Sequence, residues 1–242
     1  MITALIITFI YVTILTLIMK RSGVKYTDIL DNERTLLRGL LIPVAISTTL
    51  LTVYAWLAGW LPRVFVDEQP IDHVWLLIIP AGLLATIVWR LFHGNWNKYG
   101  RRGLIYLIIG TLLVGFSEEL LMRGIFVQAL QDDGYAAIIV ALMSSIVFGV
   151  IHGTNALNGQ AIKLTIQQII LTAIYGVMMY MILRVTGTLW APILFHFLYD
   201  LSLMLVMTTM NKTDGRKGRA TFIDYAPLVL YGLSFIGLFF IS

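Results

Sequence analysis

Residues 104–124 read LIYLIIGTLLVGFSEELLMRG, and this stretch decides how the chain can fold. Fourteen residues without a charge, Leu104 to Ser117, run directly into Glu118, Glu119 and Arg123. An ionisable side chain at the centre of a bilayer costs about 2.5–3.5 kcal/mol on insertion scales, so such residues are rare unless they serve a function. The stretch therefore predicts a membrane-embedded helix that carries a polar site.

The composition extends this interpretation to the whole chain. Of the 242 residues, 59% are hydrophobic and 12% are charged, whereas an ordinary soluble domain carries about 25% charged residues. Such a chain cannot cover a water-facing surface, so we expect an all-α, polytopic membrane helical bundle in which residues 1–242 form a single transmembrane domain. The absence of cysteine excludes disulfides, thiolate metal sites and a cysteine nucleophile.

Apolar runs of about 20 residues predict eight transmembrane helices. The first ends in Lys20 and Arg21 and has no small-residue cleavage site, so we expect a retained span rather than a signal peptide. Pro43, Pro80 and Pro192 lie near expected helix beginnings, where a missing N–H matters least. A polar loop at 211–219 precedes the last helix, which is short for a full crossing. The expected spans are roughly 2–19, 39–60, 75–93, 103–130, 136–153, 164–184, 189–209 and 226–241.

The basic residues support this number of spans. Fourteen of the 17 lysines and arginines lie in alternate loops, and the opposite loops hold only Arg63 and Arg184. Under the positive-inside rule, the basic loops face the cytoplasm and both termini face away from it. The net charge of +4 is therefore explained by topology, and we expect a lipid bilayer rather than a nucleic acid as the partner.

Two later spans carry polar clusters of their own. One contains Phe148 and His152 at i and i+4, and the other contains His196 and Asp200 at the same spacing. On the expected spans, Glu118, His152 and His196 lie at depths that differ by up to about 13 Å at 1.5 Å per residue, so tilted helices are needed to bring them together.

Each cluster has a structural interpretation and a functional one. Glu119 and Arg123 can pair along one helix face, which leaves Glu118, about 100° away, free to take a proton from water. A buried salt bridge, a histidine that is merely hydrogen-bonded and a polar pair between helices are the structural alternatives. Three such clusters on three spans point to one shared site. We therefore expect Glu118, His152 and His196 to converge, and Asp200 to orient His196.

The ordered motifs Glu-Glu-x-x-x-Arg, Phe-x-x-x-His and His-x-x-x-Asn/Asp resemble those of the CPBP family. This family contains the CAAX prenyl proteases and the bacteriocin-processing (Abi) enzymes, and the resemblance covers roughly residues 103–210. It implies an eight-helix membrane fold, hydrolysis of peptides within the bilayer, water activation by Glu118, and polarisation of the scissile carbonyl by His152 and His196. The CAAX-cleaving branch usually has asparagine where this chain has Asp200, and a carboxylate cannot donate a hydrogen bond to an oxyanion.

The residues leave the type of chemistry open. Glu118, His152 and His196 could bind a divalent metal such as zinc, or they could act without metal, with Glu118 as general base. A non-catalytic scaffold or bacteriocin-immunity factor of the same fold is a second possibility, and a proton-coupled transporter is a third, although no inverted repeat supports transport. Because the chain is small, we expect a multi-pass protein of the bacterial plasma membrane that cleaves a leader peptide or membrane-anchored peptide rather than a prenylated CAAX protein.

Overall fold

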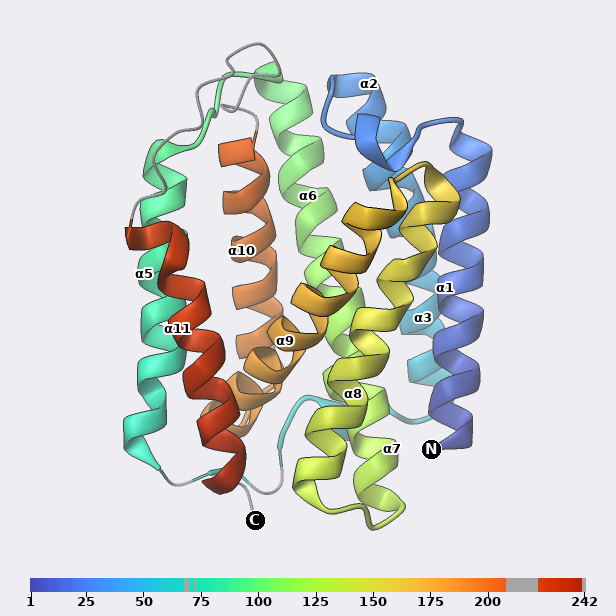
Figure 1. Ribbon diagram of the computed structural model, residues 1–242. Coiled ribbons are helices and arrows are strands. Elements are labelled where there is room, and N and C mark those ends of the chain that lie inside the picture. The colour runs from blue at the N-terminus through green and yellow to red at the C-terminus, as the bar shows by residue number, and fades with distance from the viewer. Residues whose placement is uncertain (68–69, 72, 208–221, 241–242) are drawn as a thin grey trace.

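The computed structural model describes residues 1–67, 70–71, 73–207 and 222–240, without side-chain surroundings for 222–228. Over these residues the chain forms an all-α bundle (Figure 1), as the sequence predicted. Its long helices are α1 (Ile2–Ser22), α3 (Ile42–Leu57), α5 (Ile78–His93), α6 (Gly100–Glu119), α8 (Ala137–Ile151), α9 (Ile162–Thr186), α10 (Trp190–Met207) and α11 (Phe222–Gly237).

Short helical elements extend or connect the long helices. They are η1 (Tyr26–Asp28), α2 (Glu33–Leu36), η2 (Leu37–Leu41), α4 (Leu61–Val64), η3 (Val74–Leu77), η4 (Leu120–Phe126), α7 (Val127–Asp132), η5 (His152–Asn158) and η6 (Leu238–Phe240). Within the described part of the chain, seven helical segments are long and apolar enough to cross a membrane, and the shorter apolar segment Val229–Phe240 corresponds to the predicted eighth helix. The predicted polar loop at 211–219 lies outside the described residues.

Burial in the bundle is the reverse of burial in a soluble protein. Large apolar side chains cover the outside; Leu57, for example, is 73% exposed and Phe92 83% exposed. Charged groups lie inside, where Glu119 and Arg123 are almost completely buried. Soluble monomers rarely expose apolar patches of this extent, so the outer surface is one that faces lipid. The chain is a multi-pass membrane protein.

The second span begins earlier than the sequence suggested. Asn32 caps α2, because its side-chain oxygen accepts hydrogen bonds from the backbone N–H groups of Arg34 and Thr35 at 2.9 and 3.1 Å. The helix then runs through the π-helical turn η2 into α3, so Pro43 lies inside a continuous segment rather than near its beginning. The expectation for Pro43 is therefore wrong: a proline has no N–H to bond to the preceding turn, and the widened π turn lies immediately before it.

Arg184 also differs from its expected position. The sequence placed it in a loop opposite the basic loops, but it lies within α9, and its side chain is buried. Its Nε is 2.9 Å from Asp67 Oδ2, and its guanidinium donates to the Tyr180 hydroxyl at 2.7 Å. The arginine therefore forms an interior ion pair that holds the segment after α4 against the end of α9.

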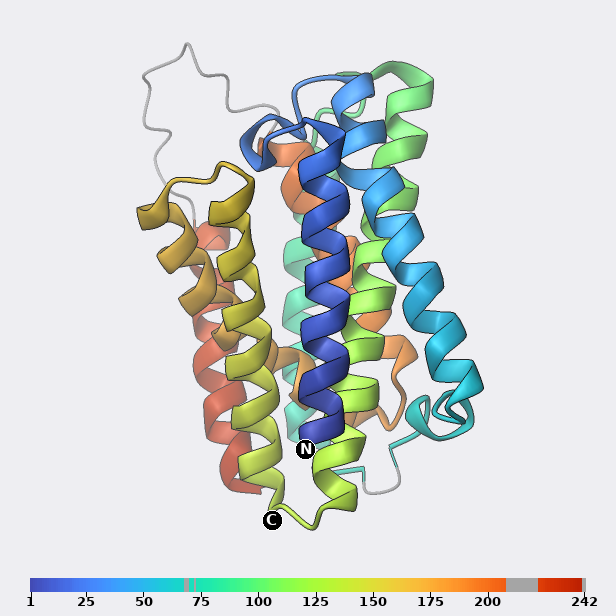
Figure 2. The same cartoon turned by 90° about the vertical axis from the view of Figure 1, so that its right-hand side faces the viewer.

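The relative positions of the helices remove the difference in depth between the polar clusters. Figure 1 shows α8 beginning close to the end of the bundle where the N-terminus lies, whereas α10 begins deeper inside and α9 crosses the bundle at a steep angle. Figure 2 shows α1 lying in front of this group, with α3 on one side and α8 on the other. Because α8 starts further out than α10, the end of α8 and the middle of α10 reach the same level.

Candidate active site

The acidic motif lies where α6 widens into a π-helix. Glu119 is the last residue of α6, and η4 begins at Leu120. All seven residues of η4 are buried, including Arg123. A single π-helical turn within an α-helix often occurs at a functional site, because it changes the direction of side chains without ending the helix. Here Glu118 and Glu119 lie immediately before the π-helix, and Arg123 lies within it.

Two glycines allow the helices that carry the site to approach closely. A Cβ on Gly115 would lie 2.8 Å from the backbone nitrogen of Phe197, so the backbones of α6 and α10 are in contact one residue from His196. A Cβ on Gly149 would lie 2.5 Å from the Ile169 carbonyl oxygen, which brings α8 equally close to α9. Small residues at such crossings are the usual means of close helix packing in membranes.

Glu119 and Arg123 form a completely buried ion pair, as their i,i+4 spacing predicted. Arg123 Nε lies 3.3 Å from Glu119 Oε2, and both side chains are fully inaccessible. A second guanidinium nitrogen donates to the Gly176 carbonyl oxygen of α9 at 3.0 Å. The guanidinium carbon also lies 4.4 Å from the centroid of the Phe148 ring on α8. Arg123 therefore links α6, α8 and α9.

Glu119 also holds His196. The Nδ1 atom of His196 is 2.7 Å from Glu119 Oε1, and because an ion-paired carboxylate only accepts, Nδ1–H is the donor. The other ring nitrogen, Nε2, lies 3.5 Å from Asp200 Oδ2 and 3.8 Å from Glu118 Oε2. Glu119 thus makes the shorter contact with this ring, and the orienting role expected of Asp200, which lies beside the nitrogen that faces Glu118, stays a prediction.

His152 is oriented in a similar way by the backbone. It follows the last residue of α8, and its Nδ1–H donates to the Phe148 carbonyl oxygen at 2.9 Å. Its Nε2 then lies 4.0 Å from Glu118 Oε2. Glu118 Oε2 is buried and has no hydrogen-bond partner within the described structure. The structure thus brings Glu118, His152 and His196 together, with both Nε2 atoms directed at one carboxylate oxygen.

Accessibility divides these residues into two layers. The side chains of Glu119, Arg123 and His196 are at most 5% exposed, whereas those of Glu118, His152 and Asp200 are 15–21% exposed. The first layer holds the helices and the His196 ring, and the second is partly accessible from outside the protein. Separations of 3.8 and 4.0 Å between polar atoms are too long for direct hydrogen bonds and suit a bridging water.

Sequence reasoning missed several neighbours of this site. The Tyr175 ring on α9 packs edge-on against His196, with ring centroids 5.4 Å apart. Phe148, which belongs to a predicted motif, makes the same kind of contact with both histidines. Tyr11 on α1 donates to the Ser117 hydroxyl at 2.8 Å, next to Glu118. Tyr11 and Tyr175 belong to no short motif, because their spans contain no ionisable residue near them that would draw attention.

The site does not fit a metal ion as it is arranged. Zinc with nitrogen and oxygen ligands near 2.0 Å in a tetrahedron holds its ligand atoms about 3.3 Å apart. The two distances from Glu118 to the histidines are longer than this. Among the described residues, no group of three or more His, Cys, Asp or Glu side chains has an arrangement that could hold a metal ion.

Comparison with known proteins finds one family model that matches the segment containing the site. A family model described as "Type II CAAX prenyl endopeptidase Rce1-like" matches residues 100–202, the segment from the start of α6 to the middle of α10. No curated protein and no solved structure matches the chain. The matched segment contains all six of the predicted site residues. Residues 100–202 are therefore similar to the Rce1-like CAAX prenyl endopeptidases, over the same segment whose motifs resemble the CPBP family.

Proposed function

We propose that this protein is an intramembrane endopeptidase in which Glu118 activates the attacking water. The observation that carries the proposal is the buried Glu118 Oε2 atom, which has no hydrogen-bond partner among the described residues and faces the Nε2 atoms of His152 and His196. A buried polar atom normally has a partner, and the exceptions call for an explanation such as catalysis. The Rce1-like match supports protease activity.

The hydrolysis can be written with this chain's own residues. A water held between Glu118 Oε2 and His152 Nε2 gives one proton to Glu118 as its oxygen attacks the scissile carbonyl carbon. His196 Nε2, when the ring carries both protons, donates to the developing oxyanion. The C–N bond then breaks, and Glu118 returns the proton to the leaving amine nitrogen. Glu119 and Arg123 position His196 and the helices, and Asp200 lies beside the oxyanion donor.

The substrate we propose is a membrane-associated or leader peptide, cleaved at the plasma membrane of a bacterium. The accessible side chains of the site lie within the bundle, so the scissile bond must belong to a segment that can enter a membrane protein. The apolar exterior and the absence of a large polar region favour a substrate that is itself held at the bilayer.

The test is cleavage of a membrane-anchored reporter peptide by the purified full chain in proteoliposomes. Glu118→Gln keeps the size of the side chain but removes the base, so we expect it to fold and to lose cleavage by at least about 100-fold, in line with the contribution of a general base. The matched control is Glu33→Gln, which changes an exposed glutamate of α2 far from the site. Equal activity of Glu118→Gln and the wild type would refute the proposal.

Two further results distinguish the alternatives. A chelator should leave cleavage intact; loss that is restored by zinc would replace the metal-free scheme with a metalloprotease. Peptide binding without cleavage by the wild type would instead indicate a scaffold or immunity factor with the same fold.

A further inference from the structure

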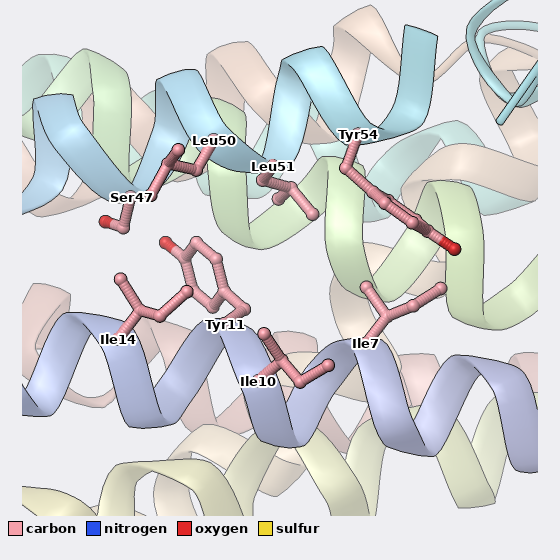
Figure 3. Close-up of a pocket in the computed structure, with 8 residues that line it drawn as sticks. All are labelled: Ile7, Ile10, Tyr11, Ile14, Ser47, Leu50, Leu51 and Tyr54. Atoms are coloured by element: carbon pink, nitrogen blue, oxygen red, sulfur yellow. The ribbon is translucent and has the colours of Figure 1, made fainter. Parts of the chain in front are cut away.

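The seam between α1 and α3 contains two hollows outside the candidate active site. The first has a volume of about 110 Å³ and is lined by Ile7, Ile10, Tyr11, Ile14, Ser47, Leu50, Leu51 and Tyr54. Figure 3 shows these side chains facing one another across the gap between the two helices. Ile10 and Leu50 are about half exposed, so the hollow opens to the outer surface of the bundle.

The first hollow is lined mainly by apolar side chains, and the Ser47 and Tyr11 hydroxyl groups in its lining already donate hydrogen bonds within the protein. The Ser47 hydroxyl donates to the Pro43 carbonyl oxygen at 2.8 Å, and the Tyr11 hydroxyl donates to Ser117. A water needs two to four polar partners to occupy a cavity, and an apolar cavity without them does not hold water. In a helix seam that faces lipid, hydrocarbon is therefore the occupant that fits.

The second hollow, of about 290 Å³, continues the seam toward the basic loops. It is lined by Ile18, Arg21, Ser22, Arg38 and Ile42. Both arginines are exposed, and within the described structure neither side chain makes a hydrogen bond or an ion pair. The two arginines have no counter-ion among the described residues and lie next to an apolar hollow. This arrangement complements a molecule with an anionic headgroup and an apolar chain.

The spacing of the lining residues along the two helices places the two hollows in line with each other. On α1, Ile14 and Ile18 are one turn apart, and Arg21 follows within the next turn. On the other side, Arg38 in η2 is one turn before Ile42, and Leu50 is about two turns further along α3. The arginines lie at the end of the bundle that carries the basic loops, which the positive-inside rule assigns to the cytoplasmic leaflet, where anionic lipids are concentrated.

We propose that this seam is a binding site for an anionic phospholipid of the bilayer. The phosphate lies between Arg21 and Arg38, and one acyl chain runs past Ile18 and Ile42 into the apolar hollow beside Tyr11. A zwitterionic lipid brings a cation of its own beside the two arginines, and a free phosphate leaves the apolar hollow unfilled. Because Tyr11 also bonds to Ser117, the acyl chain ends one side chain away from the residue next to Glu118.

The headgroup half of the site is tested with two lipids that share the same acyl chains. Binding of phosphatidylglycerol and of phosphatidylcholine to the purified full chain is measured by native mass spectrometry. The wild type should retain phosphatidylglycerol preferentially. The double variant Arg21→Gln/Arg38→Gln should lose about 30-fold in affinity for it, because each arginine near an anionic lipid surface contributes about fivefold.

The matched control is Arg34→Gln/Arg101→Gln, which removes two exposed arginines at the same end of the bundle but outside both hollows. It should bind as the wild type does. Equal loss in the two double variants would overturn the proposal in favour of general surface charge, and so would equal binding of both lipids by the wild type.

The acyl half is tested by filling the hollow. Ile10→Trp places a larger side chain at an exposed position on its wall and should reduce phosphatidylglycerol binding while both arginines remain. Soluble glycerol phosphate, which has the headgroup without the chain, should not compete. Unchanged binding in Ile10→Trp, or full competition by glycerol phosphate, would refute the site.

Discussion

Replacing Arg123 with alanine should destabilise the bundle more than almost any other single change. The guanidinium is completely buried, pairs with Glu119 at 3.3 Å, and donates to the Gly176 carbonyl oxygen at 3.0 Å. It also lies over the Phe148 ring. Alanine would leave a buried carboxylate with only His196 as its partner, remove the bond from α6 to α9, and leave an empty volume between three helices.

The expected cost follows from this burial. Removing one partner of a buried ion pair typically costs about 3–5 kcal/mol, because the remaining charge stays desolvated. The natural comparison is Arg63, which pairs with Asp132 at 2.9 Å while both side chains are 41–51% exposed. An exposed pair of this kind contributes about 0–1 kcal/mol. Arg63→Ala should therefore be close to the wild type in stability.

The assay is reversible unfolding of the purified protein in mixed micelles, with helicity measured as the denaturing detergent is increased. The double variant Glu119→Ala/Arg123→Ala completes a cycle, and it should be less destabilised than the sum of the single changes because no charge is left unpaired. If Arg123→Ala is as stable as Arg63→Ala, the structural role assigned to the buried pair is wrong. If it folds normally and Glu118→Gln remains active, the roles of the two glutamates are reversed.

Two further predictions concern the geometry around His196. Asp200→Asn keeps an acceptor oxygen beside Nε2 and should retain substantial activity, whereas Asp200→Leu should lose about 10–100-fold in reporter cleavage; equal and complete inactivity of both folded variants would show that the charge itself participates. Gly115→Ala should also lower cleavage, because its Cβ would meet the backbone of α10 at 2.8 Å and push His196 away from Glu118. Gly110→Ala on the same helix is its control, since the new Cβ would meet only the side chain of Leu40, and equal activity of the two alanine variants would contradict this explanation.

Much of the architecture could be predicted because a membrane span is recognised from one continuous stretch of the sequence. Every backbone polar group in hydrocarbon must be satisfied within its own helix, so a run of about 20 apolar residues is enough to predict a span. The Glu119–Arg123 pair was predictable for the same reason: residues at i and i+4 meet on one helix, whatever surrounds them. The errors at Pro43 and Arg184 arose where helices continued beyond the apolar run that defined them.

The sequence by itself determined that the chain crosses the membrane several times and that three of its spans carry charged or histidine side chains. Only the tertiary structure decided which atoms meet. The bond from His196 Nδ1 to Glu119 joins residues 77 positions apart, and no spacing rule could favour Glu119 over Asp200, one turn away. That choice depends on the backbone contact at Gly115, the different starting depths of α8 and α10, and the tilt of α9. These are properties of helix packing, which is set by the shapes of whole surfaces rather than by any short stretch of residues.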